Sequence, residues 1–198
     1  LLTVMTTTAA LAETSNDGGW SYSLTADGKC NITGFLLSND KRELTIPKTL
    51  DGKTVISISP NALSGFTKLT TIKFYQDAAI QNMPYVQNST NFMYVKLIND
   101  AETTVAENTL PASMTEIGNA FRGSGITELT MPGVTSIGGS AFEGCNSLTT
   151  LTFEKEVTID TGGYQSTVFA RIGSWCTVTY PGEISKWSCY DYQFSPNL

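Results

Sequence analysis

The sequence predicts a repeat solenoid, a right-handed coil of about six short parallel strands that is either mainly β or α/β. Two observations predict this fold: a repeated segment and a regular series of strand patterns. Related sequence occurs at residues 58–74, 117–132 and 137–153, and each copy carries Ala followed by Phe or Leu. Self-similarity with a period of about 20–29 residues is typical of a solenoid, in which no unit buries its apolar edge alone.

Short alternating stretches mark the predicted strands. Each contains an apolar-x-x-apolar-x-apolar pattern, whose final alternation is typical of a half-buried strand. The central apolar residues of these patterns are Leu44, Ile72, Val95, Leu129, Leu151 and Val178. They lie 28, 23, 34, 22 and 27 residues apart, so the shortest units carry 22 or 23 residues and the others carry insertions. The longest gap contains the polar segment 99–108, which we expect to form a loop or a small extra turn.

The two ends of the predicted stack differ from its repeats. Residues 20–35 form two alternating stretches joined by Asp27-Gly28, which is a strong hairpin signal. We expect this hairpin to cap the first coil, because an open solenoid end exposes strand edges and core. Aromatic residues are concentrated at the other end, at Trp175, Trp187, Tyr190, Tyr192 and Phe194. They predict an aromatic C-terminal cap, the alternative being an exposed platform on which carbohydrate rings stack.

These observations divide the chain into four predicted segments. They are residues 1–12, an N-terminal cap hairpin at 13–43, the solenoid at 44–182, and a C-terminal cap or tail at 183–198. The first segment ends in Ala10-Leu11-Ala12, the small-x-small pattern that signal peptidase requires, so we interpret it as the remnant of a secretory signal peptide. The alternative is a short buried strand or helix. No apolar run reaches the ~18 residues of a membrane span.

The composition argues against several classes of function. Acidic residues outnumber basic ones by 18 to 12 without a basic cluster, so nucleic-acid binding is not expected. Histidine is absent, which excludes Ser-His-Asp and Cys-His catalysis and removes a common metal ligand. The carboxylates are scattered over predicted loops, which disfavours a glycosidase pair. We therefore expect no enzyme, no metal site and no cofactor.

Four cysteines are present, at Cys30, Cys145, Cys176 and Cys189. Their spacings match no metal-binding motif. Export would permit disulfides, and the predicted pair is Cys176 with Cys189, whose short loop would contribute roughly 3 kcal/mol. The alternative is that all four are unpaired buried thiols. Cys145 lies within a repeat, where we expect a free thiol that fills the core.

Two stretches of the chain have a recognisable consensus. One comprises Leu44-Thr-Ile46-Pro47 and the following Asp51-Gly-Lys-Thr-Val55, and the other is Ile-Gly-x-x-Ala-Phe-x-x-Cys-x-x-Leu at residues 137–148. These stretches resemble BspA-type leucine-rich repeats over about residues 20–182, weakly at 75–110. The resemblance implies an exported cell-surface protein, bacterial or occasionally from a protist, with a role in adhesion or host-protein binding. It implies no catalytic residues, because the shared motif residues occupy core positions.

The solvent side of the strand ladder is the predicted binding surface, since solenoids bind through this broad face. Threonine dominates its outward positions, and a structural explanation suffices because Thr favours strands and pairs well across them. Larger polar side chains interrupt the threonines near the middle of the ladder. The predicted partner-binding residues are Lys73, Tyr94, Lys96, Glu128, Thr130, Thr150 and Thr152.

The sequence therefore predicts a secreted or cell-surface protein without catalytic activity, and a bacterial source is favoured over a eukaryotic one. We expect it to bind a protein partner, either a host extracellular protein or a component of the cell envelope. The alternatives are a glycan-binding module and a structural spacer.

Overall fold

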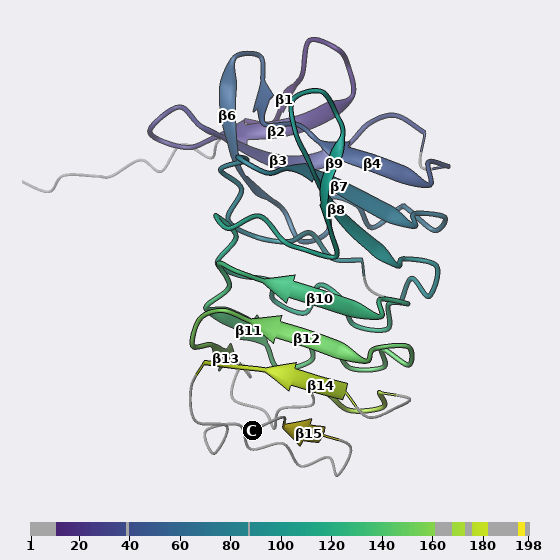
Figure 1. Ribbon diagram of the computed structural model, residues 1–198. Helices are drawn as coiled ribbons and strands as arrows, with labels where there is room; N and C mark the ends of the chain where they lie inside the picture. The colour runs from purple at the N-terminus through teal and green to yellow at the C-terminus, as the bar shows by residue number, and fades with distance from the viewer. Residues whose placement is uncertain are drawn as a thin grey trace, which may run out of the picture.

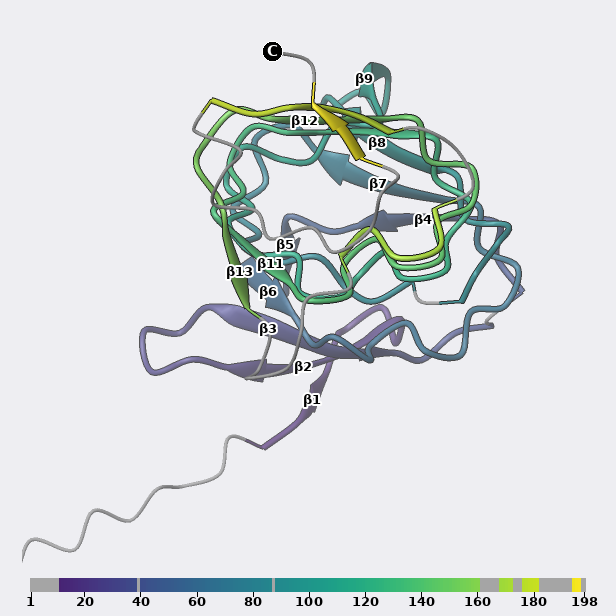
Figure 2. The same cartoon turned by 90° about the horizontal axis from the view of Figure 1, so that it is seen from below.

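The computed structural model describes residues 11–38, 40–86, 88–160, 168–172, 176–181 and 194–196. Within these ranges the chain forms fifteen strands and no helix, so the fold is mainly β rather than α/β. It is a solenoid of about six turns whose coils stack from the N-terminal end to the C-terminal end (Figure 1). Seen along the stack, the coils superpose as a ring with strands on two of its sides (Figure 2).

The first side is a ladder of parallel strands in two blocks. The first block contains β4 (Glu43–Ile46), β7 (Thr71–Tyr75) and β8 (Tyr94–Ile98). The second contains β10 (Glu128–Met131), β12 (Thr150–Phe153), β14 (Cys176–Thr179) and β15 (Phe194–Pro196). The predicted strand centres are in register, because Ile72 lies opposite both Leu44 and Val95, and Leu151 lies opposite both Leu129 and Val178. The period-2 alternation thus predicted both the strands and their alignment.

The second side is a less continuous parallel ladder. Its strands are β3 (Cys30–Phe35) with β6 (Lys53–Ile58), and β11 (Ser136–Gly138) with β13 (Thr158–Asp160). Between these pairs, single bridges join Asn82 to Glu116 and Glu116 to Ser136. The side chain of Asn82 completes the connection to β6, since its Oδ1 accepts from the Ile58 N–H at 3.1 Å and its Nδ2 donates to the Ile58 carbonyl.

The N-terminal hairpin is present as the sequence predicts. β2 (Trp20–Leu24) pairs antiparallel with β3 across the Asp27-Gly28 turn, where Gly28 has φ of 77°. Two short strands extend this sheet, β1 (Glu13–Thr14) beside β2 and β5 (Thr49–Leu50) beside β6. Because β3 pairs with β6, the hairpin extends the second ladder rather than the β4 side.

The insertion at residues 99–108 forms a hairpin rather than a loop. β8 reverses at residues 99–103 into β9 (Thr104–Glu107), which pairs antiparallel with it. Asn108 then joins the two ladder blocks, because its N–H donates to the Val95 carbonyl and its own carbonyl accepts from the Thr130 N–H. Asn108 is buried and has φ of 46°, a left-handed conformation that asparagine tolerates better than most residues.

The part of each C-terminal coil that carries turns instead of strands contributes a buried aromatic ring, and these rings pack in a column. Phe142 stacks between Phe121, at a centroid distance of 5.8 Å, and Phe169, at 6.2 Å, with interplanar angles of 6° and 4°. The alanines before Phe121 and Phe142 are fully buried, as the repeated Ala-Phe dipeptide predicts. At each corner that follows, a glycine adopts positive φ, 68° at Gly123 and 76° at Gly144.

Replacing Phe142 with alanine should lower the free energy of unfolding by about 3–5 kcal/mol, because a fully buried ring between two others is lost. Urea denaturation of the two proteins measures the change. The exposed Lys155→Ala variant is the control and should change stability by no more than about 0.5 kcal/mol. A loss below about 1 kcal/mol for Phe142→Ala would contradict a continuous aromatic column.

Candidate functional site

The outward side chains of the ladder form two rows in each block. In the first block the rows are Glu43–Thr71–Tyr94 and Thr45–Lys73–Lys96. In the second they are Glu128–Thr150–Thr177 and Thr130–Thr152–Thr179. All seven predicted partner-binding residues lie on this ladder face. Thr71 is the exception to the expected exposure: it lies between the longer Glu43 and Tyr94 side chains and is 2% exposed.

The two lysines of the first block are held by ion pairs. Lys73 Nζ lies 2.6 Å from Glu43 Oε2, and Lys96 Nζ lies 2.9 Å from Glu107 Oε1. Lys96 also lies 5.5 Å from the centroid of the Tyr94 ring, within cation–π range. The hydrogen bond from Lys73 lowers the pKa of Glu43, and the hydrogen bond to Glu107 raises the pKa of Lys96.

Glu107 belongs to β9, so the sequence did not indicate that it would meet Lys96. The same hairpin reaches the turns beyond β4 and β7, because Lys48 Nζ contacts both Asp77, at 3.1 Å, and Asp100, at 2.6 Å.

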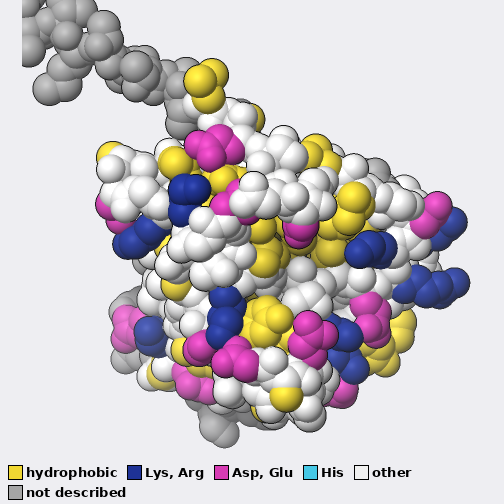
Figure 3. Space-filling model, turned by 90° about the horizontal axis from the view of Figure 1, so that it is seen from above, with side chains coloured by type: hydrophobic (Ala, Val, Ile, Leu, Met, Phe, Trp, Pro, Cys, Tyr) yellow, Lys and Arg dark blue, Asp and Glu magenta, His cyan; other side chains and the backbone are white. Residues whose placement is uncertain are grey.

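Seen from the N-terminal end, basic and acidic side chains are interspersed around an apolar hollow (Figure 3). That end of the molecule therefore offers no basic patch of the kind that binds nucleic acid.

The second block of the ladder face is neutral and regular. Thr130, Thr150 and Thr152 are half-exposed, and Glu128 is exposed at the junction with the first block. There the Asn108 Nδ2 donates to Glu128 Oε1 at 3.3 Å. The ladder face therefore consists of a charged half with one tyrosine and a threonine half, which meet at Asn108.

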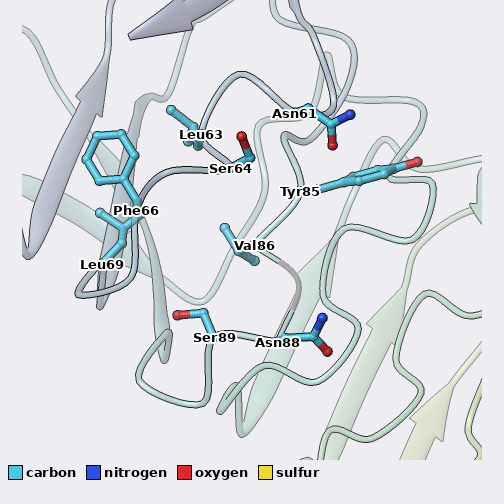
Figure 4. Close-up of a pocket in the computed structure, with 9 residues that line it drawn as sticks. All are labelled: Asn61, Leu63, Ser64, Phe66, Leu69, Tyr85, Val86, Asn88 and Ser89. Carbon is cyan, nitrogen blue, oxygen red and sulfur yellow. The ribbon is translucent and has the colours of Figure 1, made fainter. Parts of the chain in front are cut away.

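Two hollows lie away from the ladder face. One is a pocket of about 200 Å³ between residues 61–69 on one side and residues 85, 86, 88 and 89 on the other (Figure 4). The other is a polar groove of about 340 Å³ on the second ladder, with Glu116 as its single carboxylate. Across the described part of the chain, no three His, Cys, Asp or Glu side chains are grouped as metal ligands. Neither hollow pairs two carboxylates as glycosidase chemistry requires.

The repeats match the family model for the BspA-type leucine-rich repeat region, in six copies over residues 100–198. The chain belongs to this family. Among solved structures, the BspA-type coil resembles a leucine-rich repeat protein of T. pallidum, with a TM-score of 0.61 and 19% identity over 85% of this chain and 72% of that one. This likeness establishes the shared fold.

Two further structures are less similar. A leucine-rich cell surface protein of Faecalibacterium prausnitzii has 19% identity and a TM-score of 0.37 over 75% of this chain and 56% of its own. A leucine-rich repeat protein of Bacteroides ovatus has 18% identity and a TM-score of 0.41 over 81% and 54%. Among curated proteins, none matches the sequence. None of the described residues belongs to a helix with the length and apolar character needed to cross a membrane.

The repeat cysteine Cys145 is a buried free thiol, as expected for the BspA-type core. It donates a hydrogen bond to the Phe121 carbonyl at 3.0 Å, and burial raises its pKa. Cys30 is likewise buried and free. Cys176 is also a buried free thiol. Because Cys189 lies outside the described residues, the pairing of Cys176 with Cys189 stays a prediction that peptide mapping without reduction would test.

Other expectations also fall outside the described residues. They concern residues 1–10 of the predicted signal remnant, most of the C-terminal segment 183–198, and the aromatic side chains assigned to the C-terminal cap. The described Leu11 and Ala12 are exposed and precede β1. The boundaries of the four predicted segments stay predictions.

The Glu43 carboxyl should titrate below its ordinary pKa of 4.5, and Lys73→Met should return it toward that value. Because the folded-state pKa is depressed, the ion pair stabilises the protein above the ordinary pKa, and this contribution is lost as pH falls through the folded-state pKa. NMR titration of the side-chain carboxyl measures the shift. Lys155→Met, at an exposed site beyond β12, is the control, and equal Glu43 pKa values with and without Lys73 would contradict the pairing.

Proposed function

We propose that this chain is the protein-binding module of a secreted or cell-surface protein and has no catalytic activity. Its partner would be a host extracellular protein or a component of the cell envelope, bound through the ladder face. The observation that carries the proposal is the alignment of outward side chains from successive strands into continuous rows. A broad surface of this kind suits another macromolecule better than a small molecule.

The charged half of the ladder face is the proposed centre of binding. Tyr94 is half-exposed there, and aromatic side chains are enriched among the residues that dominate binding energy. The ion pairs already order Lys73 and Lys96, so less conformational entropy is lost when a partner contacts them. The threonine half would supply a rigid, neutral surface that surrounds this centre.

Membership in the BspA-type family and the small-x-small pattern at residues 10–12 support export. A glycan-binding role is the second candidate, favoured by the polar groove on the second ladder. Its amide and hydroxyl side chains include Asn31, Ser57 and Gln81, and such groups both donate to and accept from sugar hydroxyls.

The Tyr94→Ala, Lys96→Ala double variant should bind its partner at least about 30-fold more weakly, because a hot spot contributes about 2 kcal/mol or more. Binding would be measured by surface plasmon resonance, with partners recovered first from a panel of immobilised extracellular-matrix proteins and from cell-envelope extracts. Circular dichroism would verify the fold of the variant.

The matched control is Lys155→Ala, Glu156→Ala, which changes two exposed residues outside the ladder rows and should leave binding unchanged. Equal affinity of the ladder variant and the wild type would exclude the proposed centre. Binding to a glycan array without any protein partner would favour the second candidate, and retention of neither class would favour a structural spacer.

A further inference from the structure

The aromatic column of the C-terminal coils stops partway through the molecule. Phe142 donates its backbone N–H to the Val168 carbonyl of the next coil, and two coils earlier Val86 donates in the same way to the Ala120 carbonyl. Val86 therefore has the backbone position that Phe142 has in its own coil, while the ring of Phe92, from the same coil as Val86, packs against Phe121 at a centroid distance of 6.3 Å. In the preceding coil, Ala62-Leu63 stands where the later repeats carry Ala-Phe. Among the described residues the column therefore ends at Phe92, and the coil before it has Leu63 in place of a ring.

The pocket of about 200 Å³ lies between the coil of Leu63 and the coil of Val86. Its lining residues are Asn61, Leu63, Ser64, Phe66, Leu69, Tyr85, Val86, Asn88 and Ser89. Figure 4 shows Leu63, Phe66 and Leu69 on one side and Tyr85 and Val86 on the other. The apolar members are buried, whereas Asn61, Ser64 and Asn88 are exposed, so the pocket has an apolar wall and a polar margin. None of its residues belongs to a ladder strand.

One polar atom in the pocket wall has no partner. The Ser89 hydroxyl oxygen is buried and forms no hydrogen bond with the described residues. A buried hydroxyl without a partner is unfavourable, so native structures rarely keep one unless water or a ligand satisfies it. A serine hydroxyl changes direction by rotation about one bond, which lets it meet a polar atom that enters the pocket.

We propose that this pocket binds a phenol ring, supplied by a tyrosine side chain of a partner or by a small phenolic molecule. Its volume suits a single ring, because a cavity of ~150 Å³ binds benzene while most small-molecule sites are roughly 300–1,000 Å³. The ring would lie against Leu63 and Val86. Its hydroxyl group would pair with Ser89.

The test is an NMR titration of the full chain with p-cresol, the side-chain analogue of tyrosine, and with toluene, which lacks the hydroxyl. We expect p-cresol to shift the signals of Leu63, Val86 and Ser89 and to bind about 2–12-fold more tightly than toluene, the range for one net hydrogen bond. Ser89→Ala should reduce p-cresol affinity to that of toluene. Ser64→Ala, a serine at the exposed margin of the same pocket, should leave both affinities unchanged.

Val86→Phe should place a ring in the pocket and weaken p-cresol binding at least about 10-fold. Leu63→Phe is the second filling variant, for use if Val86→Phe does not fold. A Tyr-containing pentapeptide that binds more tightly than p-cresol would assign the ring to a protein partner, whereas p-cresol binding alone would assign it to a small molecule. No p-cresol shifts at the pocket, or equal affinity for toluene that Ser89→Ala leaves unchanged, would overturn the proposal.

The ladder variant Tyr94→Ala, Lys96→Ala should bind p-cresol as the wild type does, because its substitutions lie outside the pocket. Failure of the proposed ladder-face function is therefore distinguishable from failure of this inference.

Discussion

Each coil of this protein buries its apolar side chains only against the coils on either side of it. Leu44, Ile72 and Val95 lie in register in the first block of the ladder, and Phe121, Phe142 and Phe169 stack behind the second. A single coil of about 22 residues would leave two apolar faces in water, so the stack is stable only as a continuous whole. The strands, corners and ladder face all depend on this contact between neighbours.

The contact between neighbouring coils differs at Asn108, where a polar residue joins the two blocks of the ladder. A polar side chain occupies a core position there, and its burial is tolerated because its amide receives the Val95 N–H and donates to Glu128. The chain between Ile98 and Asn108 leaves the coil as the turn and second strand of the β8–β9 hairpin. That hairpin brings Glu107 to Lys96 and Asp100 to Lys48, and so makes the two halves of the ladder face chemically different.

Sequence alone predicted the features that depend on local periodicity. Alternation in steps of two placed Ile72 opposite Val95 and Leu129 opposite Leu151, and the Ala-Phe dipeptide predicted the opposite wall. It did not predict β9, because a polar strand that pairs with one neighbour lacks a buried face and leaves no alternation to detect. The sequence also did not predict the burial of Asn108, because a polar residue at a core position has the sequence pattern of a loop.

The two candidate sites, the ladder face and the pocket, also differ in how far the sequence predicts them. Outward positions follow from register, so the sequence alone places Lys73, Tyr94 and Lys96 on one face, whereas the ion pairs of the two lysines are visible only in the structure. The pocket follows from a departure, Ala62-Leu63 in place of Ala-Phe, whose meaning depends on the three-dimensional stack. Only the structure showed that Val86 of the next coil lines the same pocket and that Ser89 lies in its wall.

Native-state hydrogen exchange of the full chain tests most directly whether the coils form one cooperative core across the Asn108 junction. The account predicts that amides in β7, β8, β10 and β12 exchange with a common free energy, equal to that of global unfolding, while those in β9 exchange sooner. Protection in one block of the ladder while the other block exchanges like an unfolded chain would contradict it.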